Sequence, residues 1–235
     1  MNGIYLKIII CAAMGYLIGS FNLAYILAKL KGYDIRMHGS GNAGASNTVI
    51  LMGKKAGFIV ALVDIFKSYL AIRLAMYLCP DSKLSLFITA TSVILGNIFP
   101  FYMNFKGGKG FAALAGTVLG CNYKLFFILL IIVAVLVFIT DYVCVGPMFA
   151  SLAFPVCSII EQRETYPVIF FLATGAILYR HMENIKRIKN GSELRFSFLW
   201  NRKREAERFG IIDDDGENYP FDKKPGPAEK ENKLF

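Results

Sequence analysis

The sequence predicts an all-α polytopic membrane protein of about seven transmembrane helices, with the amino terminus outside and the carboxyl terminus in the cytoplasm. Of its 235 residues, 55% are hydrophobic and 18% are charged, whereas soluble chains carry about 25% charged residues. The mean hydropathy is +0.49. Apolar runs of roughly 20 residues, the length that crosses a bilayer core, recur along the chain. This composition excludes an ordinary soluble domain.

Basic charge is concentrated in the membrane part of the chain. Residues 1–200 hold 18 Lys and Arg against 8 Asp and Glu, while residues 201–235 hold 8 against 9. The excess fits the positive-inside rule and an attraction to lipid headgroups and phosphates. The charges are scattered among hydrophobic segments rather than along one face, so we expect no nucleic-acid partner.

The predicted spans are 4–30, 56–79, 84–103, 111–120, 124–140, 145–160 and 166–179. Lys29, Lys31 and Arg36 follow the first span, and this basic cluster places the next connection in the cytoplasm. The first run is too long for the apolar region of a signal peptide. The span 111–120 is short and is expected to start inside the protein.

The second span carries ionisable residues at membrane depth. Asp64 and Lys67 are three residues apart and therefore share a helix face on which they can pair. Such groups must face protein or water rather than lipid. We expect a structural ion pair here.

Beyond Trp200 the chain is polar, with an aspartate run at 213–215 and a Lys-Lys-Pro sequence at 223–225. Residues 1–200 are therefore predicted to form one membrane domain. Residues 201–235 are predicted to form a polar, disordered cytoplasmic tail.

Three polar segments, 36–55, 105–113 and 180–193, emerge on the cytoplasmic face in this topology. Together they hold the main glycine and polar clusters and both histidines. Their convergence at one mouth of the bundle predicts an anion-binding site.

The first segment contains the sequence from His38 to Asn47, ten small or polar residues between apolar runs. Its glycines permit positive φ and a close approach of the backbone to a ligand. Its serine and asparagine side chains can donate hydrogen bonds to an anionic oxygen.

The second segment, Gly107-Gly108-Lys109-Gly110, is similar to a phosphate cradle: successive backbone N–H groups, one cation and a helix start near Phe111. It lacks the spacing of a Walker motif. A flexible basic turn touching lipid headgroups remains an equal interpretation of this segment alone.

The third segment places His181 and Asn184 three residues apart at the end of the last helix, where both can face one ligand. The neighbouring Arg180, Lys186 and Arg187 equally suit headgroup contact. Two histidines without a carboxylate cluster disfavour a metal site. The five cysteines show no paired spacing, so neither a disulfide framework nor a zinc site follows from them.

Taken together, the three motifs resemble the bacterial acyl-phosphate:glycerol-3-phosphate acyltransferases, the PlsY family. The resemblance covers roughly residues 10–200. It lies in Gly39–Asn47 with Gly53–Gly57, in Gly107–Ala112, and in His181–Arg187 with Gly191 and Glu193. The combination is far more specific than any one part.

The resemblance implies transfer of a fatty acyl group from acyl phosphate to the 1-hydroxyl of glycerol 3-phosphate, giving lysophosphatidic acid and phosphate. It implies a seven-helix acyltransferase domain in the bacterial inner membrane, with the site facing the cytoplasm, and neither coenzyme A, another cofactor nor a metal. Both substrates and membrane lipids are the expected partners, and the soluble acyl-phosphate synthase is a candidate partner.

By motif position, the resemblance implies catalytic roles for four residues and substrate or phosphate binding for eight. The catalytic set is Ser40, Lys109, His181 and Asn184. The binding set is Gly39, Gly41, Asn42, Asn47, Gly107, Gly108, Gly110 and Arg187.

The chain departs from the family pattern at a few positions. Ile50 stands where the family has an arginine, which removes a guanidinium able to clamp phosphate bidentately. Ala113 stands at a family threonine and Asn97 at a usual histidine. Arg36 and Arg187 are the candidates to compensate. An inactive homologue, or one that binds another organic phosphate, is therefore the main alternative.

Two other functional classes remain open. A transporter for a small organic anion predicts an inverted repeat and polar residues through several spans, and neither stands out in the sequence. A non-catalytic scaffold that holds acyl phosphate or its synthase predicts binding without turnover.

Overall fold

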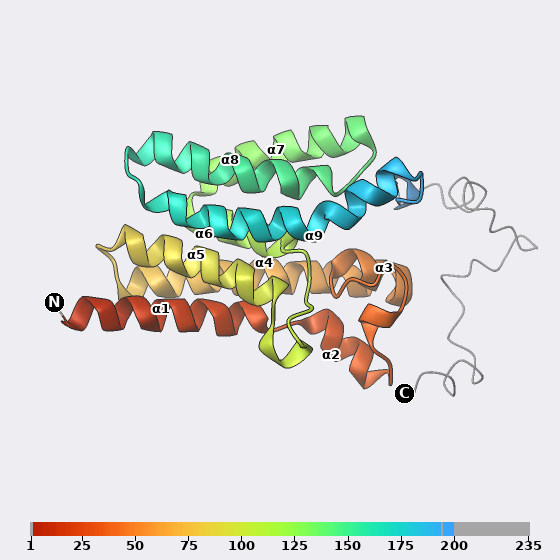
Figure 1. The fold of residues 1–235 in the computed structure, drawn as a ribbon, viewed down its shortest axis with the longest axis horizontal. Coiled ribbons are helices and arrows are strands. Elements are labelled where there is room, and N and C mark those ends of the chain that lie inside the picture. The colour runs from red at the N-terminus through yellow and green to blue at the C-terminus, as the bar shows by residue number, and fades with distance from the viewer. Residues whose placement is uncertain (1, 194, 200–235) are drawn as a thin grey trace, which may run out of the picture.

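The computed structural model describes residues 2–193 and 195–199, and these fold as a bundle of helices (Figure 1). The α-helices are α1 (Asn2–Ser20), α2 (Leu23–Leu30), α3 (Ala45–Met52), α4 (Lys54–Leu78), α5 (Lys83–Ile98), α6 (Phe111–Cys121), α7 (Tyr123–Thr140), α8 (Val145–Gln162) and α9 (Phe171–Lys189). Single 3-10 turns are η1 (Ile35–Met37), η2 (Phe101–Met103), η3 (Tyr166–Phe170) and η4 (Phe196–Leu199). The predicted tail 201–235 lies outside the described residues.

Four helical segments are long and apolar enough to cross a membrane: Tyr5–Leu30, Lys83–Met103, Tyr123–Thr140 and Val145–Gln162. Within them α7 is the most lipid-like, because Phe138 and Ile139 are 76% and 77% exposed on its outer face. These helices confirm the predicted all-helical class. The count of seven spans and the orientation of the termini stay predictions, since α6 has only 11 residues.

The first predicted span is interrupted, so the expectation of one continuous helix over 4–30 is wrong. α1 ends at Ser20 and α2 begins at Leu23. Asn22 caps α2, because its Oδ1 accepts a hydrogen bond from the Tyr25 N–H at 2.8 Å. Asparagine is among the residues preferred at this capping position.

Main-chain groups at this interruption are satisfied by side chains from other helices. The Lys67 ammonium donates to the Phe21 carbonyl. The Tyr102 hydroxyl donates to the Ser20 carbonyl at 2.8 Å and accepts from the Asn22 N–H at 3.1 Å. An irregular backbone at membrane depth is tolerated only where its polar groups find such partners.

The predicted ion pair between Asp64 and Lys67 is confirmed. In α4 the Lys67 Nζ lies 2.6 Å from Asp64 Oδ1, and the two side chains are only 7% and 9% exposed. Lys67 therefore neutralises Asp64 and supports the α1–α2 interruption with the same ammonium group.

The polar connection predicted for 36–55 is partly helical, which the sequence reasoning did not expect. It contains η1 and α3 (Ala45–Met52), and α3 packs against the start of α4. Gly53, with φ +87°, separates α3 from α4. Part of the glycine-rich segment is therefore held by a helix.

Close packing between the long helices depends on small residues. A Cβ on Gly19 of α1 would lie 2.1 Å from the Val93 carbonyl oxygen of α5. A Cβ on Gly116 of α6 would lie 2.0 Å from the Ile65 carbonyl oxygen of α4. Small residues let membrane helices approach this closely.

An aromatic cluster forms the centre of the largest apolar core. Phe87 of α5, Phe154 of α8 and Phe170 of η3 are fully buried. Their ring centroids are 6.2 Å apart for Phe87 and Phe154, and 4.9 Å apart for Phe154 and Phe170. This core holds the start of α9 against α5 and α8.

We expect Gly116→Ala to lower the stability of the protein by about 1–3 kcal/mol, because the new methyl group must push α6 away from α4. The measurement is thermal unfolding in detergent, followed by circular dichroism at the helical band.

The matched control is Gly175→Ala in α9, where a Cβ meets nothing within 4 Å. A helix-interior Gly→Ala change without a clash is neutral or stabilising by up to about 1 kcal/mol. Equal melting temperatures for the two variants would contradict the packing described for α4 and α6.

Candidate functional site

The three polar segments lie at one end of the bundle, around α3, the connection between α5 and α6, and the carboxyl-terminal end of α9 (Figure 1). The first and second meet where Gly108 faces the Ala43 carbonyl, since a Cβ on Gly108 would be 3.4 Å from that oxygen. The second and third meet at Lys109, whose Nζ donates to Asn184 Oδ1 at 2.5 Å. The geometry therefore brings together parts of all three predicted segments.

The connection of residues 104–110, here the 104–110 loop, is tied to the end of α5. The Gly107 N–H donates to the Ile98 carbonyl at 2.9 Å, and the Gly108 N–H donates to the Asn97 carbonyl at 3.0 Å. These bonds satisfy carbonyls that a helix end leaves without partners.

This pairing changes the predicted phosphate cradle. The Gly107 and Gly108 N–H groups, expected as phosphate donors, are already used in this structure. N–H groups in the first turn of α6 have no intrahelical partner and can receive an anion. Gly110 precedes this turn with φ +86°, a conformation that glycine adopts readily.

Lys109 is the cation at the centre of the site. Burial lowers the pKa of its ammonium to about 8, the nearby Arg187 acts in the same direction, and the Glu193 carboxylate opposes them. The group is therefore mainly charged at neutral pH but close to its titration range. A phosphate dianion beside it would favour the charged form.

Asn184 is fixed by two charged neighbours. Its Oδ1 accepts from Lys109, and its Nδ2 donates to Glu193 Oε1 at 2.5 Å. The same carboxylate accepts from Arg187 Nε at 2.8 Å through Oε2. The predicted phosphate contact of Arg187 must therefore compete with Glu193.

His181 is buried, with 3% of its surface exposed. Its Nδ1 lies 2.7 Å from the Ile177 carbonyl oxygen. Because a carbonyl oxygen can only accept, Nδ1 carries the proton in this contact. In the neutral ring Nε2 is then the acceptor, which suits a contact with a hydroxyl group.

Asn47 holds the first segment rather than presenting itself to a ligand. It is fully buried in α3, and its Oδ1 accepts from the Ser40 N–H at 2.9 Å. Its Nδ2 donates to the carbonyls of Ile35 and His38, each at 3.0 Å. Gly39 is required beside it, because a Cβ there would lie 2.3 Å from Asn47 Oδ1.

Ser40 and Asn42 are half-buried in the loop that Asn47 holds, and Gly41 is exposed. The contacts found among residues 2–193 do not join the Ser40 side chain to Lys109 or His181. Asn42 Oδ1 is buried without a hydrogen-bond partner in this part of the chain. The Ala43 carbonyl accepts from Asn22 Nδ2 at 2.9 Å, which anchors the loop to the α1–α2 interruption.

Arg36 is occupied by other groups. Its Nη2 lies 2.6 Å from Asp34 Oδ2, and its Nη1 donates to the Met103 carbonyl at 2.5 Å. It therefore braces the start of the 104–110 loop. Ile50 is half-buried in α3.

Arg180 was assigned from sequence to headgroup contact, but its Nη2 donates to the Gly107 carbonyl at 3.2 Å. The residue thus belongs to the site. The signal in the sequence was its position directly before His181. Asn22 and Tyr102, which hold the first segment in place, were signalled only by the polar residues that interrupt an apolar run.

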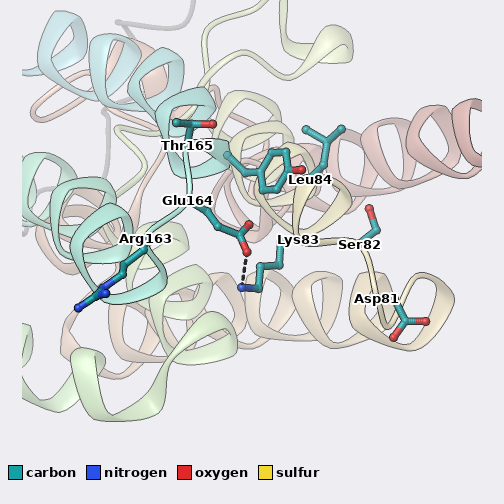
Figure 2. A pocket seen from close by; sticks show the side chains of 8 residues that line it. Asp81, Ser82, Lys83, Leu84, Arg163, Glu164 and Thr165 are labelled. Carbon is teal, nitrogen blue, oxygen red and sulfur yellow. Dashed lines mark hydrogen bonds and ion pairs between the residues drawn. The ribbon is translucent and has the colours of Figure 1, made fainter.

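A cavity of about 550 Å³ lies at the other end of the bundle, between the α4–α5 and α8–η3 connections (Figure 2). Lys83 and Glu164 pair across it at 2.7 Å. It contains none of the predicted site residues. Within residues 2–193 and 195–199, no group of three or more His, Cys, Asp or Glu is arranged to hold a metal ion.

Comparisons with known proteins agree with the resemblance. A family model described as glycerol-3-phosphate acyltransferase matches residues 9–191. A glycerol-3-phosphate acyltransferase of Bacillus cytotoxicus is 38% identical over 191 residues, covering 81% of this chain and 96% of that protein. One of Staphylococcus aureus is 36% identical over 202 residues, covering 83% and 100%.

Two solved structures have the same fold. The glycerol 3-phosphate form of PlsY (YgiH), an integral membrane glycerol 3-phosphate acyltransferase, has a TM-score of 0.75 and 29% identity. The lysophosphatidic acid form has a TM-score of 0.69 and 30% identity. Each comparison covers 82% of this chain and 96% of the other. The chain therefore belongs to the glycerol-3-phosphate acyltransferase family of bacterial integral membrane proteins.

Proposed function

We propose that this protein transfers a fatty acyl group from acyl phosphate to the 1-hydroxyl of glycerol 3-phosphate, giving lysophosphatidic acid and inorganic phosphate. The observation that carries the proposal is the contact of Lys109 with Asn184 beside the start of α6. It places a cation, a fixed amide and helix N–H groups where two anionic substrates would meet. The family membership supports glycerol 3-phosphate as the acceptor.

The reaction needs alignment more than a strong nucleophile. The glycerol hydroxyl oxygen forms a bond to the acyl carbonyl carbon, and the bond from that carbon to the phosphate oxygen breaks. The hydroxyl proton goes to a phosphate oxygen, so hydrogen phosphate leaves. Phosphate is a good leaving group, and holding both anions in position supplies much of the rate increase.

Lys109 and the first turn of α6 would neutralise the phosphate that departs. His181 Nε2 and Ser40 would orient the hydroxyl group, and Asn184 would hold the Lys109 ammonium in place. Gly39, Gly41, Asn42 and Gly110 would shape the phosphate pocket. An apolar face of the bundle would bind the acyl chain, with about 0.8 kcal/mol for each buried CH₂.

We further propose the cellular setting. Residues 1–200 would form a domain of seven spans in the bacterial inner membrane, with the amino terminus outside and the site facing the cytoplasm. The reaction as written uses neither cofactor nor metal. The soluble enzyme that makes acyl phosphate is a candidate partner at this face.

The direct test is turnover by the purified protein with acyl phosphate and glycerol 3-phosphate, measured as lysophosphatidic acid formed. We expect Lys109→Ala to lower kcat/KM by at least about 100-fold, the usual loss when one preorganised donor is removed. The matched control is Lys106→Ala, an exposed lysine of the same loop, which should retain parental activity.

Equal losses in both lysine variants would show that loop charge, not the position of Lys109, matters. Turnover with acyl-coenzyme A but not acyl phosphate would contradict the proposed donor.

Activity should depend on pH through Lys109. Its ammonium is charged below a pKa of about 8 and loses its charge as the pH rises. Since kcat/KM reports the free enzyme, we expect it to fall about tenfold per pH unit well above pH 8, after correction for uncatalysed hydrolysis. Lys109→Arg should remove this fall, because arginine stays charged. A flat profile from pH 7 to pH 10 in the parent would contradict the assignment.

Ile50 favours one alternative function, an inactive homologue or one specific for another organic phosphate. A guanidinium at this position would add a bidentate phosphate donor. We expect Ile50→Arg to raise kcat/KM about tenfold over the parent, with Ile50→Leu as the uncharged control. Absence of turnover in the parent and its appearance in Ile50→Arg would favour the inactive homologue instead.

A further inference from the structure

One arginine of the site carries a donor that no described residue satisfies. Arg180 of α9 donates from Nη2 to the Gly107 carbonyl at 3.2 Å. Its Nε is buried and has no hydrogen-bond partner within the described part of the chain. A buried donor without a partner costs roughly 1–3 kcal/mol, so its retention calls for a physical reason.

The position of this donor fits an anion. Nε and Nη2 lie on one edge of the guanidinium plane, the edge that binds two oxygens of a phosphate or carboxylate. Arg180 is also close enough to Lys109 and His181 to act on both electrostatically. An anion at Arg180 would therefore lie within the field of Lys109 as well.

The other two arginines of the polar segments are engaged by carboxylates. Arg36 pairs with Asp34 at 2.6 Å, and Arg187 pairs with Glu193 at 2.8 Å. Arg180 makes no such pair in the described part of the chain. Among these arginines it can receive a phosphate without displacing a carboxylate.

A second unsatisfied group indicates what else the ligand carries. Asn42 Oδ1 is buried without a partner in residues 2–193, and it precedes Ala43, whose carbonyl faces Gly108. An amide oxygen accepts and therefore needs a donor such as a hydroxyl. The 104–110 loop is thus contacted on one side by a segment with a free acceptor and on the other by a free cationic donor.

We propose that Arg180 binds the phosphate of glycerol 3-phosphate and that Asn42 accepts a hydrogen bond from a hydroxyl of the same molecule. This inference rests on the proposed function, because it names residues of the acceptor subsite. Arg180 then has two roles through one side chain: Nη2 holds the Gly107 carbonyl, and Nε meets the phosphate. Asn42 distinguishes a polyol phosphate from phosphate alone.

The experiment measures equilibrium binding of glycerol 3-phosphate and of inorganic phosphate to the purified full-length protein in detergent. The variants are Arg180→Gln, Arg180→Lys and Asn42→Ala, with Lys186→Gln as the control. Lys186 is an exposed cation on the same helix, so its loss changes the net charge equally.

We expect Arg180→Gln to weaken both ligands at least tenfold and Arg180→Lys to weaken them less. Asn42→Ala should weaken glycerol 3-phosphate about tenfold but leave inorganic phosphate unchanged, and Lys186→Gln should match the parent for both. In turnover, Arg180→Gln should raise the KM for glycerol 3-phosphate much more than it lowers kcat.

Parental binding of both ligands by Arg180→Gln would overturn the inference, even where turnover is found. If the parent binds glycerol 3-phosphate without turnover and Arg180→Gln loses that binding, the subsite is supported and the proposed transfer reaction is refuted. If Arg180→Gln does not fold, Arg180→Lys decides: it keeps the charge but not the paired donors, and unchanged affinity would count against the inference.

Discussion

Two main-chain hydrogen bonds, from Gly107 to the Ile98 carbonyl and from Gly108 to the Asn97 carbonyl, determine where Lys109 stands. They use the unsatisfied carbonyls at the end of α5, which would be costly to leave unpaired next to lipid. Because the loop is fixed in this way, the Lys109 ammonium reaches Asn184 and the first turn of α6 begins beside it. The helix end thus serves as the anchor of the anion site.

The same principle explains the rest of the polar network. The α1–α2 interruption exposes backbone groups, and Lys67 and Tyr102 satisfy them. Asn22 then extends the network to the Ala43 carbonyl of the glycine-rich segment. Most buried polar side chains therefore hold loops in place, and only a few groups retain unused hydrogen-bonding capacity. Those few, above all Arg180 Nε and Asn42 Oδ1, are where we place the substrate.

The sequence predicted the helical class, the Asp64–Lys67 pair and the meeting of the polar segments, since hydropathy, i,i+3 spacing and glycine clustering are local signals. It missed the interruption after Ser20, because the residues around it are apolar enough to continue a span. It also assigned Asn47 and the Gly107 N–H to ligand binding, although both are used within the protein. Whether a polar group is free depends on partners far away in the chain, which spacing cannot show.

The central claim is that the three polar segments open on one side of the membrane. The most direct test labels single cysteines at Ser46, Lys106 and Lys189, all exposed, with Lys83 at the opposite end. The five native cysteines are first replaced by serine, and a membrane-impermeant maleimide is applied to intact cells and to inverted vesicles. We expect the first three positions to react only in inverted vesicles and position 83 only in intact cells. Reaction of any of the first three from the side that labels position 83 would contradict the account.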